Sequence, residues 1–191
     1  KTSLSPTSSH LTPAAVRDAL ARYSTFAEAT NTDLRSVSMI DLGDIDSPDF
    51  ADGESRVANF AADLLNKHKL IVALGGDNSI TYSFVKGLWN NVENIGVITF
   101  DAHHDLRDGE SNGSPIWRLI QAGLPGKNIV QIGIADFANS SEYSERAKEH
   151  GVTVITRAEM RSTTMPEIIR RAVDIAGMQG RDIYVDVDVD V

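Results

Sequence analysis

The sequence predicts an α/β protein with a mainly parallel sheet that helices cover on both faces. Short, continuous apolar runs alternate with helical patterns along much of the chain, which is the order expected of strand–helix units. The 191 residues are 41% hydrophobic and 24% charged, an ordinary globular composition. No linker or internal repeat divides them, so we expect a single domain over residues 1–191.

The N-terminal part contains the least regular patterns. Thr12 as N-cap and Pro13 at the first helical position predict a helix over 14–23. The β-branched and apolar stretch 36–42 predicts a strand, and the Gly, Asp, Ser and Pro residues of 43–53 predict a loop.

The rest of the chain alternates strands with helices. Apolar runs predict strands over 70–74, 95–100, 129–134, 152–155 and 183–191. Helical spacing predicts helices over 54–67, 79–89, 115–122, 141–150 and 166–178. Thr164 and Glu167 have the spacing of a capping box before the last of these helices. Because the chain stops at Val191, inside an alternation of valine and aspartate, we expect a fragment whose C-terminal strands and helices are missing.

Composition excludes several classes of function. The chain has no Cys, which removes disulfides, zinc–thiolate sites and thiol nucleophiles and fits a reducing, cytoplasmic location. A net charge of -9 argues against nucleic-acid partners. No apolar run approaches the length of about 20 residues that a membrane helix needs, so no membrane partner is expected.

Two of the predicted strands end in residues that can bind cations. Asp101, His103 and Asp105 follow the strand 95–100, and if this segment stays extended their side chains point to one side. A solvated polar loop is the simpler alternative, but carboxylates placed directly after a buried strand are costly unless something compensates them. Carboxylates with one imidazole suit Mn(II) or a similar cation.

The last strand repeats this acidic pattern. Asp186, Asp188 and Asp190 alternate with valines, so three carboxylates face one way. An edge strand with a solvated face would also explain the alternation, yet like charges on one strand face repel and a cation would relieve the repulsion. Two acid-rich strand ends in one parallel sheet can converge on a pair of metals. An acidic calcium-binding module is disfavoured because the EF-hand register is absent.

These motifs, together with Gly-Gly-Asp-Asn-Ser at 75–79, resemble the ureohydrolase superfamily of arginases, agmatinases and formimidoylglutamases. The resemblance runs from about Val72 to Val191. It implies a three-layer α/β/α sandwich with two Mn(II) per subunit at the carboxyl end of the sheet. It also implies attack of a bridging hydroxide on an amidine-type carbon, and a homo-oligomer, either a trimer or a hexamer.

The resemblance assigns a role to each acidic residue of the two motifs. Asp101 would bridge both metals, His103 would bind one, and Asp105 would bind the other. Asp188 would be the second bridging carboxylate, and Asp190 would bind the same metal as His103. Among these residues, Asp101 and Asp105 are the ones we expect to act in catalysis.

Two positions depart from the common family pattern. Asn78 stands where the family usually has a metal-binding His, so it is a weaker candidate ligand and the corresponding metal should be held less tightly. Asn112 stands where arginases and agmatinases commonly have a His that shuttles protons. Formimidoylglutamases have a small polar residue there, which favours that activity.

The segment after the histidine motif is where the family binds its substrate. The expected substrate-binding residues are Arg107, Ser111, Asn112, Gly113 and Ser114. Arg107 and Arg118 are the candidates to bind a carboxylate. The sequence therefore predicts an enzyme that converts N-formimidoyl-L-glutamate to glutamate and formamide, as in histidine degradation. The alternatives are an agmatinase or other guanidino hydrolase that releases urea, and a degenerate member that binds metal or ligand without turnover.

Overall fold

The computed structural model describes residues 3–5, 7–49 and 51–190. Its centre is a parallel sheet with the strand order β5-β4-β3-β6. The strands are β3 (Ile95–Phe100), β4 (Ile129–Ile134), β5 (Thr153–Thr156) and β6 (Asp182–Val187). The predicted parallel sheet is confirmed, and β3 and β4 have the predicted bounds.

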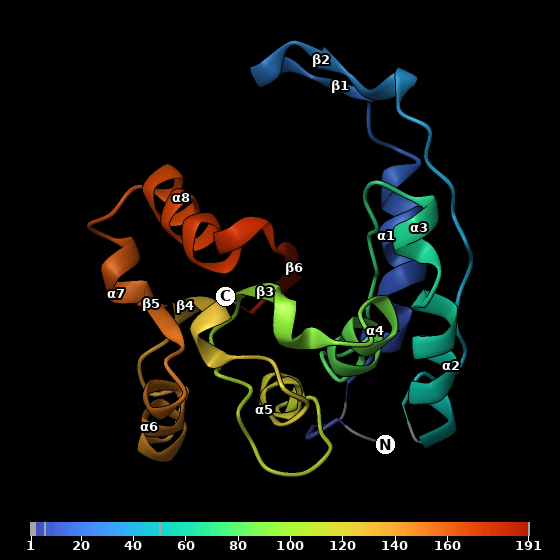
Figure 1. Ribbon diagram of the computed structural model, residues 1–191. Helices are drawn as coiled ribbons and strands as arrows, with labels where there is room; N and C mark the ends of the chain where they lie inside the picture. Colours follow the sequence, from blue (N-terminus) through green and yellow to red (C-terminus); the bar gives the residue numbers. More distant parts are fainter. Residues whose placement is uncertain (1–2, 6, 50, 191) are drawn as a thin grey trace.

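Apolar clusters lie on the two opposite faces of this sheet. Val97 belongs to one cluster and Ile98 to the other, as expected for neighbouring residues of a strand. The helices α5 (Pro115–Gln121) and α6 (Ser141–Glu149) complete the first cluster, and α8 (Met165–Ala176) completes the second. Figure 1 shows α8 on one side of the sheet and α5 and α6 on the other. The predicted α/β/α layers are therefore present.

The remaining helices differ from prediction mainly at their ends. The predicted helix 54–67 starts earlier and is interrupted, forming α2 (Ala51–Ala61) and α3 (Leu64–Lys67). The predicted capping box at Thr164 is confirmed. The other helices are α4 (Ile80–Leu88) and the short, unpredicted α7 (Arg157–Met160). Single turns of 3-10 helix occupy Ser9–Leu11, Glu28–Thr30, Leu34–Ser36, Val92–Asn94, Gly126–Asn128 and Met178–Gly180.

The first helix, α1 (Thr12–Leu20), lies at the surface and has no buried residue. Thr12 was predicted as its N-cap, but a 3-10 turn runs directly into the helix, so Thr12 is already helical and Leu11 is the N-cap. A small antiparallel hairpin of β1 (Phe26–Ala27) and β2 (Thr32–Asp33) follows, which the sequence did not indicate. This hairpin stands away from the body of the molecule (Figure 1).

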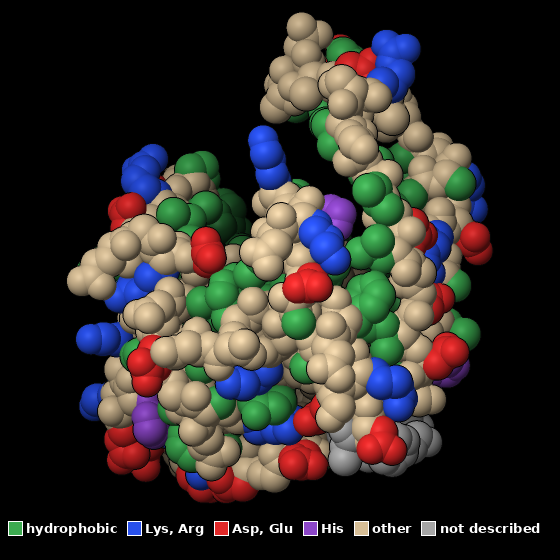
Figure 2. All heavy atoms as spheres, turned by 45° about the vertical axis from the view of Figure 1, so that its right-hand side comes forward, with side chains coloured by type: hydrophobic (Ala, Val, Ile, Leu, Met, Phe, Trp, Pro, Cys, Tyr) green, Lys and Arg blue, Asp and Glu red, His purple; other side chains and the backbone are tan. Residues whose placement is uncertain are grey.

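Two predicted strands are wrong. The segment 36–42 continues from a 3-10 turn as irregular chain, and 70–74 is irregular throughout. Most of their apolar side chains are exposed, with 79% exposure at Met39 and 81% at Leu70, although Ile71 is partly buried. A strand needs a hydrogen-bonded neighbour, and neither segment pairs with another within the described part of the chain. Figure 2 shows hydrophobic side chains at the surface between the hairpin and the body.

The last predicted strand is shorter than expected. β6 ends at Val187 rather than at 191, and the chain then turns through Asp188 and Asp190. No helix among the described residues is long and apolar enough to cross a membrane.

Candidate metal and substrate site

The ends of β3 and β6 place the two acidic motifs side by side. The strands are parallel neighbours, so their carboxyl ends lie at the same edge of the sheet. The pairing continues one residue past β6, because the backbone N–H of Asp188 donates to the carbonyl of Phe100 at 2.9 Å. Asp101, the first residue after β3, is only 4% exposed.

Three predicted ligands form one cluster. The ligand atoms of Asp101, His103 and Asp190 all lie within 4.8 Å of one another. Nδ1 of His103 is 3.3 Å from Oδ1 of Asp101 and 3.1 Å from Oδ2 of Asp190. One imidazole nitrogen thus lies between two carboxylates. This set of ligands suits a divalent cation that binds both nitrogen and oxygen ligands.

Asp105 lies apart from this arrangement. The expectation that 101–105 stays extended is wrong, because Asp105 has a left-handed backbone with φ of 53°. Its side chain is 8% exposed and accepts a hydrogen bond from the Nδ2 amide of Asn78. Asn78, two residues before the start of α4 at Ile80, therefore contacts the motif after β3 through Asp105.

Two carboxyl groups of the site, those of Asp101 and Asp105, are buried close to other acids. Burial, together with the charges of Asp188 and Asp190, raises the pKa of Asp101 to about 7, although the hydrogen bond from the backbone N–H of His103 lowers it. The pKa of Asp105 is also raised, first by burial and then by neighbouring acids that include Asp101. Bound cations would let these carboxylates ionise together, so the donor set fits a metal centre.

The predicted substrate segment is a folded turn with few free polar groups. The Ser111 and Ser114 hydroxyls hydrogen-bond each other at 2.8 Å, and Ser114 is fully buried. The backbone N–H of Gly113 donates to the Ser111 hydroxyl. Asn112 accepts a hydrogen bond from the backbone N–H of Leu4 at 3.0 Å, so the N-terminal segment lies against this turn. Hydrogen bonds within the turn therefore stabilise its conformation.

The two candidate arginines have different environments. Arg107 is exposed, and its backbone N–H donates to the carbonyl of Gly113 at 3.0 Å. Its guanidinium lies 5.7 Å from the centre of the Tyr143 ring and has no hydrogen bond or ion pair within the described residues. Arg118 is bound on both sides: it donates to Glu54 at 2.6 and 2.8 Å and lies 3.7 Å from the centre of the Tyr82 ring. Arg107 is therefore the available one, and Arg118 joins α5 to α2.

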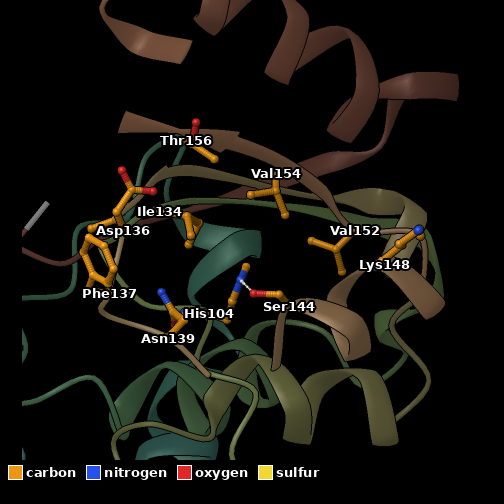
Figure 3. A pocket seen from close by; sticks show the side chains of 12 residues that line it. His104, Ile134, Asp136, Phe137, Asn139, Ser144, Lys148, Val152, Val154 and Thr156 are labelled. Carbon is orange, nitrogen blue, oxygen red and sulfur yellow. Dashed lines mark hydrogen bonds between the residues drawn. The ribbon is translucent and has the colours of Figure 1, made fainter. Parts of the chain in front are cut away.

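His104 points away from the metal cluster. Only 2% of it is exposed, and its ring nitrogens contact Gln131 at 2.7 Å and Ser144 at 3.3 Å. Figure 3 shows it at the floor of a pocket of about 590 Å³ between α6 and the strands β4 and β5. The pocket is lined by none of the predicted ligands. Figure 3 also shows the His104–Ser144 hydrogen bond, which joins the motif to α6.

Comparison with known proteins identifies the family of the chain. The model of the arginase family matches residues 2–191. The chain is 36% identical over 200 residues to formimidoylglutamase of Halalkalibacterium halodurans, covering 100% of this chain and 63% of that protein. The crystal structure of formimidoylglutamase from Bacillus subtilis matches with a TM-score of 0.91 and 32% identity, covering 100% of this chain and 62% of that one.

A more distant structure shares the fold. Formiminoglutamase of Trypanosoma cruzi with Mn²⁺ matches with a TM-score of 0.85 and 21% identity, over 94% of this chain and 62% of that one. The present chain thus spans less than two thirds of the length of each of these relatives. Because the family model matches almost every residue, the chain belongs to the arginase family.

Proposed function

We propose that the full-length protein is a cytoplasmic, manganese-dependent formimidoylglutamase. Water would be added across the formimidoyl C–N bond of N-formimidoyl-L-glutamate, which gives glutamate and formamide. The cluster of Asp101, His103 and Asp190 carries this proposal, because within the described part of the chain its ligand atoms lie close enough together to hold a cation. The 36% identity to a formimidoylglutamase over the whole chain supports the choice of substrate.

The remaining acids extend this cluster toward a second cation. Asp101, His103 and Asp190 would hold one ion, and Asp105 would hold the other. Asp188 would bridge the two together with Asp101. When bound, the ions lower the pKa of a water and polarise the amidine.

The substrate side is consistent with an acidic amino-acid derivative. The free guanidinium of Arg107 can pair bidentately with a carboxylate. Asn112 does not titrate near neutral pH, so it cannot serve as the proton shuttle that a histidine provides at this position in guanidino hydrolases. Arg107 favours a substrate with a carboxylate over agmatine, and Asn112 favours a formimidoyl substrate over a guanidino substrate.

The test compares products from the Mn²⁺-loaded, full-length protein. We expect formamide from N-formimidoyl-L-glutamate and no urea from agmatine or arginine. Asp101→Asn should abolish turnover, whereas Asp174→Asn, which changes an exposed acid on α8, should leave it intact. Urea without formamide would assign a guanidino hydrolase. Less than one Mn per chain together with no amidine hydrolysis would assign a non-catalytic member. Either result would overturn the proposal.

A further inference from the structure

The side chain of Asn78 lies between a predicted metal ligand and a hydroxyl group of α4. Its Nδ2 donates to Oδ2 of Asp105, and its Oδ1 is 3.0 Å from Oγ1 of Thr81, which donates to it. When Asp105 binds a cation its carboxylate is ionised and only accepts hydrogen bonds, so the amide must turn its nitrogen toward Asp105. The amide oxygen, the atom of Asn78 able to bind a metal, then faces Thr81 instead.

Thr81 is itself anchored to the sheet. It lies three residues after Asn78, in the first turn of α4, and is 2% exposed. Its Oγ1 is 3.0 Å from Oδ2 of Asp186 on β6. A hydroxyl has one proton, so at any moment Thr81 donates either to Asn78 or to Asp186. While Thr81 donates to Asn78 it fixes the amide oxygen, and its contact with Asp186 keeps Oγ1 beside β6.

A continuous chain of contacts therefore connects β6 to the motif after β3. It runs from Asp186 through Thr81 and Asn78 to Asp105. Asp105 needs such support, because its own backbone is in the left-handed region and does not hold it in line with Asp101. Partners outside the coordination sphere commonly orient metal ligands, and their loss lowers metal affinity about 10–100-fold.

We propose that Thr81 and Asn78 are positioning residues for Asp105, and that Asn78 is not a metal ligand. This inference rests on the proposed metal-dependent function and replaces the assignment of Asn78 to the coordination sphere. Thr81 holds the Asn78 amide in one orientation, and the amide N–H in turn holds the Asp105 carboxylate toward the cation. The residue that stands in place of the usual histidine thus acts through a hydrogen bond.

The test measures Mn²⁺ binding by the full-length protein, with free Mn²⁺ followed by electron paramagnetic resonance. Thr81→Val keeps the shape of the side chain and removes the hydroxyl. We expect it to lower the Mn²⁺ affinity of the site that contains Asp105, the weaker of the two sites, about 10–100-fold. Thr81→Ser should restore near wild-type affinity. Ser83→Ala is the matched control, because Ser83 is also a buried hydroxyl on α4 but bonds only the carbonyl of Ile80 among the described residues.

A double variant separates positioning from general damage. If Thr81 acts through Asn78, Asn78→Ala should weaken the same site, and Thr81→Val should add nothing to it. Circular dichroism of the metal-free proteins checks that each variant folds. If Thr81→Val does not fold, the Mn²⁺ affinity of Asn78→Ala tests the inference instead.

The inference would be overturned if a folded Thr81→Val or Asn78→Ala variant bound Mn²⁺ with wild-type affinity. It would also be overturned if affinity rose in Thr81→Val, because a released amide oxygen would then be ligating. If the wild-type protein bound no Mn²⁺, both this inference and the proposed manganese dependence would be overturned. Mn²⁺ binding that follows the predicted pattern without formamide release would overturn only the proposed function.

Discussion

Replacing Arg118 by Met should destabilise the fold without acting on substrate directly. The Arg118 guanidinium donates two hydrogen bonds to Glu54 and stacks on Tyr82, and its side chain is 12% exposed. The interaction joins α5 to α2, which are far apart in the sequence. Met fills most of the same volume, so the variant removes the charge and the hydrogen bonds while it keeps the packing of the aliphatic stem.

The size of the effect follows from what Glu54 loses. Hydrogen bonds to charged groups contribute about 1.5–3 kcal/mol, and the contact with Tyr82 adds about 0.5–1 kcal/mol. Removing one partner of a fully buried pair costs about 3–5 kcal/mol, but the Glu54 side chain is 22% exposed and water compensates part of the loss. We therefore expect the free energy of unfolding to fall by about 3 kcal/mol.

Urea unfolding of the full-length protein measures this loss. With a slope of about 2 kcal/mol per molar urea, the midpoint should fall by about 1.5 M. Arg107→Met is the matched control and should change stability by less than about 0.5 kcal/mol, because Arg107 is exposed. It should instead raise KM for N-formimidoyl-L-glutamate. The reasoning fails if Arg118→Met keeps wild-type stability and raises KM, since Arg118 would then bind substrate.

Two further predictions concern stability. The pKa of Asp101 is about 7 in the fold and about 3.9 in an unfolded chain, so between these pH values the metal-free folded state binds more protons than the unfolded state. The free energy of unfolding of the metal-free protein should therefore fall by a few kcal/mol from pH 4 to pH 7. Urea unfolding in EDTA at several pH values checks the sign of this change. The assignment would be contradicted if the free energy of unfolding of Asp101→Asn depended on pH as steeply as that of the wild type. Gly96→Ala should cost about 2–3 kcal/mol, because the new Cβ would lie 2.2 Å from the carbonyl oxygen of Ala176. Wild-type stability in a thermal melt would show that α8 can move away from β3.

The buried strands were predictable because burial on both faces leaves a continuous apolar run. β3 and β4 have this pattern and the predicted bounds. The segment 70–74 has the same pattern but no strand, and Leu70 and Val72 are 81% and 73% exposed. An apolar run indicates a tendency to be buried. A strand also requires hydrogen bonds to a neighbouring backbone, and the sequence of one segment does not show whether that neighbour is present.

The candidate site was predictable where it depends on strand ends. Parallel neighbours end at one edge of the sheet, so the convergence of Asp101 and Asp190 follows from topology. The orientation of Asp105 depends on a left-handed turn, and the engagement of Arg118 depends on a glutamate from another helix. The one local signal for Thr81 is its position three residues after Asn78, a spacing at which side chains of one helical turn meet.

The acidic alternation at the end of the chain shows how one pattern can serve different purposes. Period-two spacing suggests a uniform face, yet each aspartate has its own surroundings. Asp186 lies within β6, where burial raises its pKa to about 6 and Thr81 contacts it. Asp190 lies past the end of the strand, where it accepts the backbone N–H of Ala102 at 3.3 Å and faces His103. Because β6 stops at Val187, acids inside the sheet can position the site while acids beyond its edge remain free to bind a cation.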